Sequence, residues 1–389
     1  MNFSSQENGS PIRHIQKQTR SALRVIAGFC AALLLFIFAS PARPDDTASL
    51  SPQQRAALAI HTLQSWYNQQ TGLYNTTGWW NSANAITTLA GYSRISGSRE
   101  FDSIFENTFT QAQKTAPGFL NKYYDDEGWW ALAWIDVYDL TGDSRYLKMA
   151  QSIFTDMSGG WSDTCSGGIW WSKDRKYKNA IANELFLSVA AHLAARASSG
   201  AERKMYLKWS RREWQWFSHT GMINSDHLVN DGLDAQCANN HQTAWSYNQG
   251  VVLGGLAELY RTTHDHKLLT AAGSIATAAI SSPALVNASG ILHESCEPKC
   301  GGDGSQFKGI FVRNLSALEQ ASPTPAYEKF ITANAASVWS GAQPPGYRLG
   351  LMWSAPFGTD SADASTQSSA LDVLVAQLAF SAGERTGKK

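Results

Sequence analysis

The sequence predicts an all-α fold, built as a closed ring of helical hairpins with inner and outer helices. Apolar residues recur with helical periodicity, and no strand-like alternation persists for more than a few residues. The predicted helices are joined alternately by short polar turns and by long connections. The long connections carry much of the glycine and several Trp and Asp residues, which indicates that one end of the ring holds a functional site.

The elements follow one another as helical segments broken by Gly, Pro, Asn and Asp clusters. The turn after the fourth helix is the clearest boundary, because Gly142 suits a helix end and Asp143 or Ser144 suits the cap of the next helix. The segment 285–295 is either a weak helix or a hairpin. The periodicity predicts helices near residues 51–70, 80–96, 99–115, 127–141, 143–157, 177–198, 201–219, 242–262, 265–280, 306–320, 324–340 and 364–382.

An open stack of helical hairpins is the alternative arrangement of these elements. Stacked repeats normally carry distinct capping repeats and keep a clear period. This sequence has a degenerate hairpin repeat, in which a helix, a tight polar turn and a second helix recur without a fixed period. We therefore expect the closed ring.

Composition limits the classes of partner. The 389 residues carry no net charge, and only 16% of them are charged, so no basic stripe for nucleic acid is present. Fifteen Trp residues favour a ligand with flat apolar faces, such as a sugar, although many aromatic residues must serve the core. We expect a monomer that has no cofactor, no metal, no nucleic-acid partner and no stable membrane partner.

The N-terminal sequence is typical of a targeting segment. A basic stretch from Arg13 to Arg24 precedes an apolar run from Val25 to Ala39, which is short for a membrane span. We predict a signal peptide over 1–42, a short linker over 43–50, a catalytic domain over 51–383 and a polar tail over 384–389. The protein is then secreted, to the extracellular space or the cell wall, and an uncleaved signal anchor that tethers it to a membrane is the alternative.

The cysteines agree with secretion. Four remain after the leader, namely Cys165, Cys237, Cys296 and Cys300, an even set that suits two disulfides. Cys296 and Cys300 can close a short loop, which leaves Cys165 with Cys237, a pairing that sequence does not prove. A zinc site is disfavoured because the usual ligand spacings are absent. Glycosylation sequons occur at Asn75, Asn287 and Asn314.

Polar and aromatic residues gather where helices follow the long connections. These helix starts lie around Trp79 to Asn84, Asp125 to Trp130, Tyr177 to Glu184, Thr243 to Gly250 and Gly301 to Arg313. Capping alone explains Asn and Asp at such positions, but it does not require Trp, Tyr and Phe. If all these starts meet at one end of a ring, they line a groove with stacking faces and hydrogen-bonding groups, as a polysaccharide needs.

Asp125 and Asp126 are the natural reacting pair within that groove. Adjacent acids before an apolar run are usually a helix N-terminus, so the structural interpretation competes with a catalytic one. Retaining glycosidases need two carboxyl groups roughly 5 Å apart, which suits neighbouring residues better than the wider spacing of inverting enzymes. Mutual repulsion keeps one carboxyl protonated as the donor, and backbone N–H groups at the helix start keep the other ionised as the nucleophile.

The stretch Tyr124-Asp-Asp-Glu-Gly-Trp-Trp-Ala-Leu-Ala-Trp-Ile-Asp-Val-Tyr-Asp-Leu-Thr-Gly-Asp143 resembles the hallmark of glycoside hydrolase family 76. Segments 167–172, 178–186, 245–251 and 302–313 are similar to that family as well, and the resemblance spans about residues 50–380. It implies an (α/α)6 barrel, action on α-1,6-mannan and retention of configuration. It also implies that Asp125 is the nucleophile, that Asp126 is the acid/base and that these carboxylates need no metal.

Within the groove we predict two kinds of substrate contact. Stacking is expected from Trp80, Trp130, Trp171 and Tyr247. Hydrogen bonds are expected from Asn81, Asn183, Asn248, Gln249, Asp303, Lys308 and Arg313.

The function predicted from sequence is therefore endo-acting, retaining hydrolysis of α-1,6-mannosidic bonds, with α-1,6-mannan or a mannoprotein glycan as the partner. One alternative keeps the site and changes the acceptor, so that a mannoprotein glycan is transferred to wall polysaccharide. A second alternative is a non-catalytic mannan-binding wall protein, which is disfavoured because both aspartates are present.

Overall fold

The computed structural model describes residues 50–386, except 343 and 359–361. Helices dominate this part of the chain, and the strands named in it are the two-residue pair β1 (Tyr67–Asn68) and β2 (Leu73–Tyr74). The leader, the linker and the tail after residue 386 lie outside the described residues, so the predictions made for them remain predictions. Within the described ranges, no helix combines the length and the hydrophobicity that a bilayer span requires.

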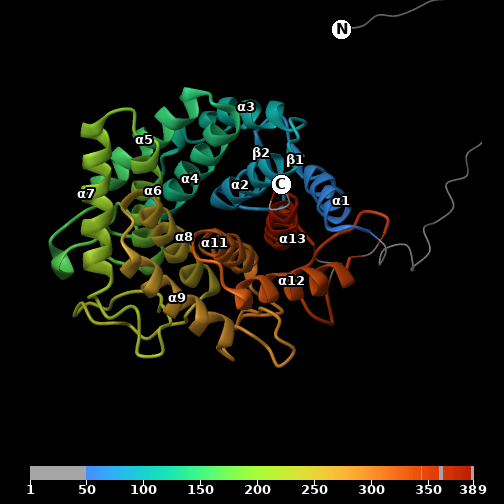
Figure 1. Ribbon diagram of the computed structural model, residues 1–389. Helices are drawn as coiled ribbons and strands as arrows, with labels where there is room; N and C mark the ends of the chain where they lie inside the picture. Colours follow the sequence, from blue (N-terminus) through green and yellow to red (C-terminus); the bar gives the residue numbers. More distant parts are fainter. Residues whose placement is uncertain (1–49, 343, 359–361, 387–389) are drawn as a thin grey trace, which may run out of the picture. The chain divides into compact units, whose positions relative to one another are not determined.

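The helices form two concentric layers, visible when the ring is seen end-on (Figure 1). The inner helices are α2 (Trp79–Ser96), α4 (Tyr124–Thr141), α6 (Ala180–Ala195), α8 (Ser246–Thr263), α11 (Phe307–Ala321) and α13 (Ala364–Thr386). The outer helices are α1 (Pro52–Gln64), α3 (Asp102–Gln111), α5 (Ser144–Ser158), α7 (Gly200–Phe217), α9 (His266–Ser281) and α12 (Pro325–Ser340).

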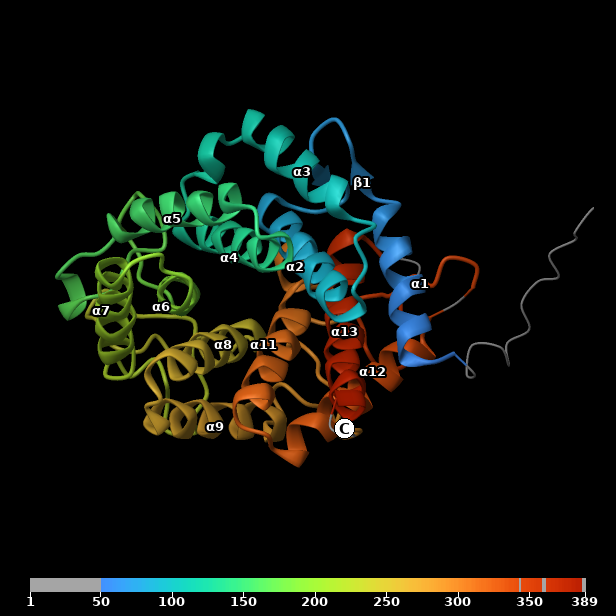
Figure 2. The ribbon, with the colours of Figure 1, turned by 45° about the horizontal axis from the view of Figure 1, so that its top comes forward.

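The inner layer is closed. Each inner helix packs against the next in chain order, and the last, α13, packs against the first, α2 (Figures 1 and 2). Outer helices α5, α7 and α9 pack against the inner helices that precede them, and α1 and α12 both pack against α13. This is the predicted (α/α)6 barrel, and the open stack of hairpins is wrong.

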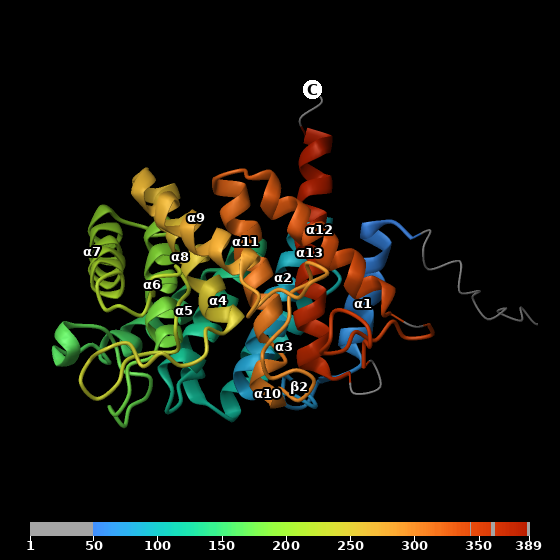
Figure 3. The ribbon, with the colours of Figure 1, turned by 90° about the horizontal axis from the view of Figure 1, so that it is seen from below.

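The two ends of the barrel differ in their connections. The C-terminal ends of inner helices lead into short turns, such as the one in which Gly142 adopts a left-handed conformation and Asp143 caps α5 by accepting from the Arg145 backbone N–H. The N-terminal ends follow the long connections, which gather along the lower edge of Figure 3 and include α10 (Gly301–Gly304). The prediction that long connections share one end is confirmed.

Burial explains which helices form which layer. In α6 nearly every residue between Ala180 and Ala194 is buried, because this helix has neighbours on all sides. In α5 the buried residues form one stripe, and the remaining face meets solvent. A helix that is apolar all round must lie inside, whereas an amphipathic helix covers the outside.

Glycine allows inner helices to approach one another closely. A Cβ atom added at Gly250 of α8 would lie 2.6 Å from the Cα of Phe311 on α11. One added at Gly309 of α11 would lie 2.4 Å from the backbone oxygen of Ser369 on α13. Because the obstructing atoms belong to the backbone, a side chain at either position would force the helices apart.

Several element boundaries differ from the prediction. The helix predicted over 51–70 ends at Gln64, because residues 67–68 and 73–74 pair as a small hairpin instead. The helix predicted from 177 begins at Ala180, where the Asn179 side chain caps it. In segment 285–295, Val286 pairs with Leu292, so the hairpin alternative is the correct one.

Candidate active site

The aspartate pair lies in the first turn of α4, at the end of the barrel that carries the long connections. The helix begins at Tyr124, and Tyr123 is its cap residue, so neither aspartate caps the helix through its side chain. The backbone N–H of Tyr124 donates to the carbonyl of Trp171 at 3.0 Å, which fixes the loop 159–179 against the start of α4. Sequence and loop packing together therefore place both carboxyls at the mouth of the barrel.

Each carboxyl has one hydrogen bond from a side chain of a neighbouring loop. The indole Nε1 of Trp171 donates to Asp125 Oδ2 at 2.9 Å, whereas Asp125 Oδ1 is buried with no hydrogen-bond partner among the described residues. The amide Nδ2 of Asn121 donates to Asp126 Oδ2 at 2.5 Å. Asp125 thus keeps one oxygen free of competing bonds, which an attacking oxygen requires.

The pKa values of both carboxyls are raised above the ordinary aspartate range. Burial is the main cause for Asp125, followed by the charge of Asp126, and burial is also the main cause for Asp126. The hydrogen bonds from Trp171 and Asn121 oppose the rise. Because neighbouring acids titrate as a pair, one proton shared between them is the expected state near neutrality.

The shared proton favours Asp125 when no sugar is bound, because Asp125 is the more deeply buried of the two. The expectation that helix capping keeps Asp125 ionised in the free protein is therefore not met. Positive charge that develops on a sugar ring in the transition state stabilises the carboxylate that faces it, and it can reverse this order during the reaction.

Aromatic side chains from four inner helices line the region beside the pair. The ring of Tyr247 stacks on that of Phe307 at 3.8 Å between centroids. Phe307 lies against Trp80 at 6.3 Å, and Trp80 against Trp129 at 5.6 Å. The indole Nε1 of Trp80 also donates to Asp303 Oδ1 at 2.9 Å. Of the predicted groove residues, Trp80, Trp171, Tyr247 and Asp303 are thus brought to one end of the barrel.

Further acids that the sequence did not single out lie in the same region. The pKa of Tyr247 is raised well above its usual value by burial and then by the charges of Asp231, Asp125 and Glu184. Asp231 accepts a hydrogen bond from the Tyr177 hydroxyl at 2.5 Å. Glu184 is fully buried and neither of its oxygens has a partner among the described residues, so burial and the charge of Asp231 raise its pKa.

The amide residues predicted as substrate contacts divide into two groups. Asn248 is buried, and neither atom of its amide has a partner among the described residues, so it stays a candidate. The prediction of substrate contacts is wrong for three buried residues, because their side-chain amides already make hydrogen bonds with backbone groups. These residues are Asn81, Asn183 and Gln249. Asn81 accepts from the Gly78 backbone N–H, Asn183 pairs with both backbone groups of Ile169, and Gln249 pairs with both of Val229.

Three other predicted contacts are also wrong, each for a physical reason. Trp130 is fully buried and packs against Phe119 at 4.8 Å, so it belongs to the core. Lys308 is 1% exposed and is held by Glu297 and by the carbonyl of Leu351. Arg313 lies about two turns into α11 and forms an ion pair with Asp372 of α13. Both residues line a cavity away from the aspartate pair.

Two disulfides stabilise the long connections. Cys165 pairs with Cys237, which joins loop 159–179 to loop 218–245, and Cys296 pairs with Cys300 inside the connection before α11. Beside the first disulfide, the ammonium of Lys178 donates to the carbonyls of Ser162, Thr164 and Gly168. The loop that carries Trp171 is therefore fixed by a disulfide and by hydrogen bonds together.

The glycosylation sequons differ in accessibility. Asn75 is exposed, as an acceptor must be. Asn287 is partly buried, and its side chain oxygen accepts from the backbone of Ser289 and Ile291. Asn314 donates to the Ile310 carbonyl and lines a cavity inside the barrel, so the prediction of a surface glycan there is wrong.

The chain is similar to known proteins over most of its length. Mannan endo-1,6-alpha-mannosidase DFG5 of Candida albicans is 26% identical over 326 residues, which cover 75% of this chain and 71% of that protein. Mannan endo-1,6-alpha-mannosidase DCW1 of the same organism is 28% identical over 252 residues, 59% of this chain and 55% of that protein. The matched region thus spans little more than half of the second relative.

Solved structures share the fold. An inactive variant of the α-1,6-mannanase GH76A of Salegentibacter sp. HEL1_6, with two consecutive aspartates replaced by asparagine and in complex with α-1,6-mannotriose, superposes with a TM-score of 0.77. It is 22% identical, and the match covers 85% of this chain and 100% of that one. Dfg5 from Chaetomium thermophilum, in complex with glucosamine, gives a TM-score of 0.73 at 20% identity, over 88% of this chain and 93% of that one.

The sequence profile of one family matches residues 51–387, which includes every inner and outer helix described above. The helical barrel and the paired aspartates at the mouth of its ring agree with that match. The chain belongs to glycosyl hydrolase family 76.

Proposed function

We propose that the protein cleaves α-1,6-mannosidic bonds within mannan by double displacement with retention. The observation that carries this proposal is the pair Asp125 and Asp126 in the first turn of α4, beside an aromatic wall formed by Trp80, Tyr247 and Phe307. The names of the curated relatives, and the α-1,6-mannotriose bound to a solved relative, support the choice of substrate.

In this proposal Asp125 attacks the anomeric carbon and Asp126 protonates the leaving oxygen. A glycosyl ester forms on Asp125 as the glycosidic bond breaks, and the shortened mannan leaves with the proton of Asp126. Asp126 then takes a proton from water, the water oxygen attacks the anomeric carbon, and the ester bond breaks. The free Oδ1 of Asp125 supports its role, and the Asn121 hydrogen bond holds Asp126 in place.

The direct test replaces each aspartate by its isosteric amide. Asp125→Asn and Asp126→Asn should each lower kcat on linear α-1,6-mannan by at least a hundredfold, because each removes a group needed in the transition state. Asp226→Asn is the matched control, since Asp226 is exposed in loop 218–245. Near-normal turnover by both active-site variants would disprove the assignment.

The stereochemistry of the product gives an independent test. If the configuration is retained, the α-anomer is released first. NMR spectra recorded before mutarotation detect it. First release of the β-anomer would contradict double displacement. Adding a labelled mannooligosaccharide to the same incubation shows whether a sugar acceptor competes with water, because transfer would place the label in longer chains.

We further propose that the protein works outside the cytosol, with its catalytic domain beginning near residue 51 behind a cleaved leader. Two disulfides in its functional loops are typical of proteins made in an oxidising compartment. N-terminal sequencing of the protein recovered from the culture medium and from the membrane fraction tests the leader. A mature chain that still begins upstream of the apolar run Val25–Ala39 would favour the membrane-tethered alternative.

A further inference from the structure

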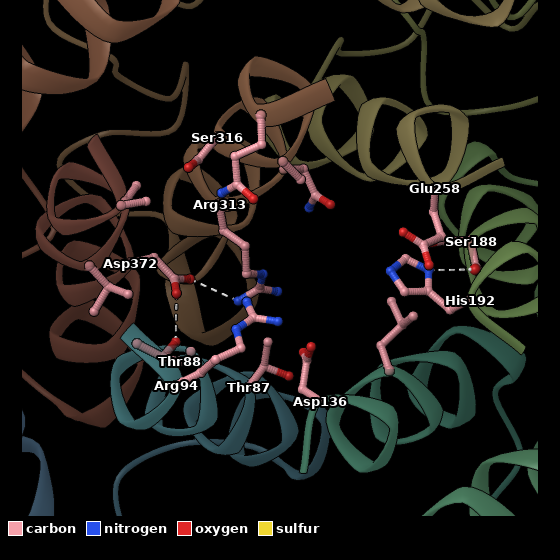
Figure 4. Close-up of a pocket in the computed structure, with 18 of the residues that line it drawn as sticks. Thr87, Thr88, Arg94, Asp136, Ser188, His192, Glu258, Arg313, Ser316 and Asp372 are labelled. Carbon is pink, nitrogen blue, oxygen red and sulfur yellow. Dashed lines mark hydrogen bonds and ion pairs between the residues drawn. The ribbon is translucent and has the colours of Figure 1, made fainter. Parts of the chain in front are cut away.

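A cavity lies inside the barrel, and Figure 4 shows residues that line it. Its volume is about 420 Å³, and residues of every inner helix line it. Asp136 of α4 lies in its wall, and eleven residues of helix after Asp125 correspond to about 16 Å. The rim includes exposed Arg94 and Arg261, so the cavity opens to solvent. A volume of several hundred Å³ is typical of small-molecule sites.

Two walls of this cavity are held by ion pairs that need no ligand. On one side Arg313 donates to Asp372 at 2.8 Å, and the Thr88 hydroxyl donates to the same carboxylate at 2.7 Å. On the other side Glu258 accepts from Arg196 at 2.9 Å and from Arg261 at 3.0 Å. Arg196 also pairs with Asp139, so the charges on these walls are matched before anything binds.

Three ionisable groups of the lining remain outside these ion pairs. Asp136 and Arg94 make no hydrogen bond or ion pair with any residue the structure describes. The imidazole of His192 uses Nδ1 toward the Ser188 carbonyl at 2.8 Å, which leaves Nε2 for the cavity. Arg94 and Asp136 lie on neighbouring helices along one wall of the cavity, and His192 lies on another wall (Figure 4). Burial raises the pKa of Asp136.

The mixture of charges selects against ions. A bound anion would be repelled by Asp136, and a bound cation would be repelled by Arg94. A neutral ligand with many hydroxyl groups satisfies all of these side chains, because each hydroxyl both donates and accepts. Trp129 and Leu132 add an aromatic and an aliphatic surface to the lining, which suits the C–H faces of a sugar ring.

We propose that this cavity is a second, non-catalytic binding site for a single neutral sugar unit. Trp129 contacts both regions, since it lines the cavity and its indole stacks on Trp80 at 5.6 Å between centroids. Arg94, Asp136 and His192 lie in the C-terminal halves of their helices, so an occupant held by them lies apart from the aspartate pair at the start of α4. The proposal does not depend on the mannanase activity, since it rests on the lining of the cavity alone.

The experiment measures binding of D-mannose by calorimetry to proteins in which the cavity is open or filled. Gly91 of α2 lines the cavity, and a Cβ added there meets only ordinary contact, 3.8 Å from Val375. Gly91→Leu should narrow the cavity and weaken the cavity-bound component of mannose binding at least tenfold. Gly91→Ala is the matched control and should bind like the parent protein.

Cleavage of α-1,6-mannan by Gly91→Leu should match the parent protein, which separates cavity binding from binding in the groove. Equal mannose binding by the parent and Gly91→Leu would overturn the proposal, as would no binding to the parent. Inorganic phosphate that displaces mannose from the cavity would identify an anion site instead and would overturn it too. If Gly91→Leu does not fold, the isosteric Asp136→Asn should show the same tenfold loss, and unchanged binding would refute the site.

Discussion

Trp171 has two separable roles in the active site. Its ring lies near Tyr123 at 4.9 Å between centroids, and its Nε1 donates to the carboxylate of Asp125. Trp171→Phe keeps an aromatic face and removes only the donor. A hydrogen bond to a charged group contributes about 1.5–3 kcal/mol. We therefore expect kcat on α-1,6-mannan to fall roughly 10- to 100-fold.

The control for this variant is Trp214→Phe, which changes the same residue type on outer helix α7. Its turnover should stay close to that of the parent protein. An unchanged kcat for Trp171→Phe would show that the indole donor does not stabilise the reacting form of Asp125.

Asn121 acts on the basic side of the pH profile. Because burial raises the pKa of the nucleophile Asp125, activity should decline, as the pH falls, at a higher pH than the ordinary aspartate value of about 4. The Asn121 hydrogen bond lowers the pKa of the proton donor Asp126, so Asn121→Ala should raise that pKa and move the basic limb of kcat/KM to higher pH. A profile measured from pH 3 to 9 tests this, and a basic limb that stays in place would contradict it.

At the scale of elements, the disulfide between Cys165 and Cys237 connects two loops that are 72 residues apart in sequence. Replacing both cysteines by serine should lower the free energy of unfolding by about 2–4 kcal/mol, because the unfolded chain regains the entropy of a long loop. Turnover should fall as well, since loop 159–179 presents Trp171 to Asp125.

The disulfide between Cys296 and Cys300 supplies the comparison, because it closes a separation of only 4 residues. Its double serine variant should be destabilised less, since a short loop loses little entropy when it is closed. Denaturant unfolding of both variants under non-reducing conditions gives the two free energies. Equal losses would show that loop length does not govern the effect.

Helix packing gives a prediction about the inner ring. A methyl group at Gly309 would meet the Ser369 backbone oxygen at 2.4 Å, so Gly309→Ala should destabilise the fold by about 1–3 kcal/mol. Gly200 begins outer helix α7, and a Cβ there has no neighbour within 4 Å. Gly200→Ala should therefore leave the stability unchanged or raise it slightly. Thermal unfolding followed by circular dichroism ranks the two variants, and a Gly309→Ala protein as stable as the parent would contradict the close packing.

At the scale of the whole molecule, the ring of hairpins and the shared end of the long loops could be predicted from sequence. Helical periodicity and loop length are properties of the local sequence, so they can be recognised without knowledge of the contacts between distant segments. The individual substrate contacts were harder to predict, because a polar residue at a helix start can form hydrogen bonds either with a ligand or with the backbone of a neighbouring loop. Asn183 and Gln249 have the expected residue type and position, yet both side chains hold loops through paired backbone bonds.

Long-range pairings explain the remaining errors. Lys308 and Arg313 look like groove residues, but their partners Glu297 and Asp372 come from other segments of the chain. The sequence does not indicate the role of Asn121, because an Asn before a helix is typical of a turn. Its hydrogen bond to Asp126 depends on how the chain bends between the two residues. Only the folded chain shows which of these polar groups are already satisfied.

Closure of the ring by α13 bears on how the protein is made. The last inner helix packs against the first, and the Gln367 amide donates to the Ala59 carbonyl at 2.9 Å, near the other end of the catalytic domain. A ribosome therefore has to finish almost the whole chain before the first helices can acquire their final neighbours. Until then α1 and α2 expose the apolar faces that α13 later covers, and exposed apolar surface of this kind makes an incomplete chain prone to aggregation.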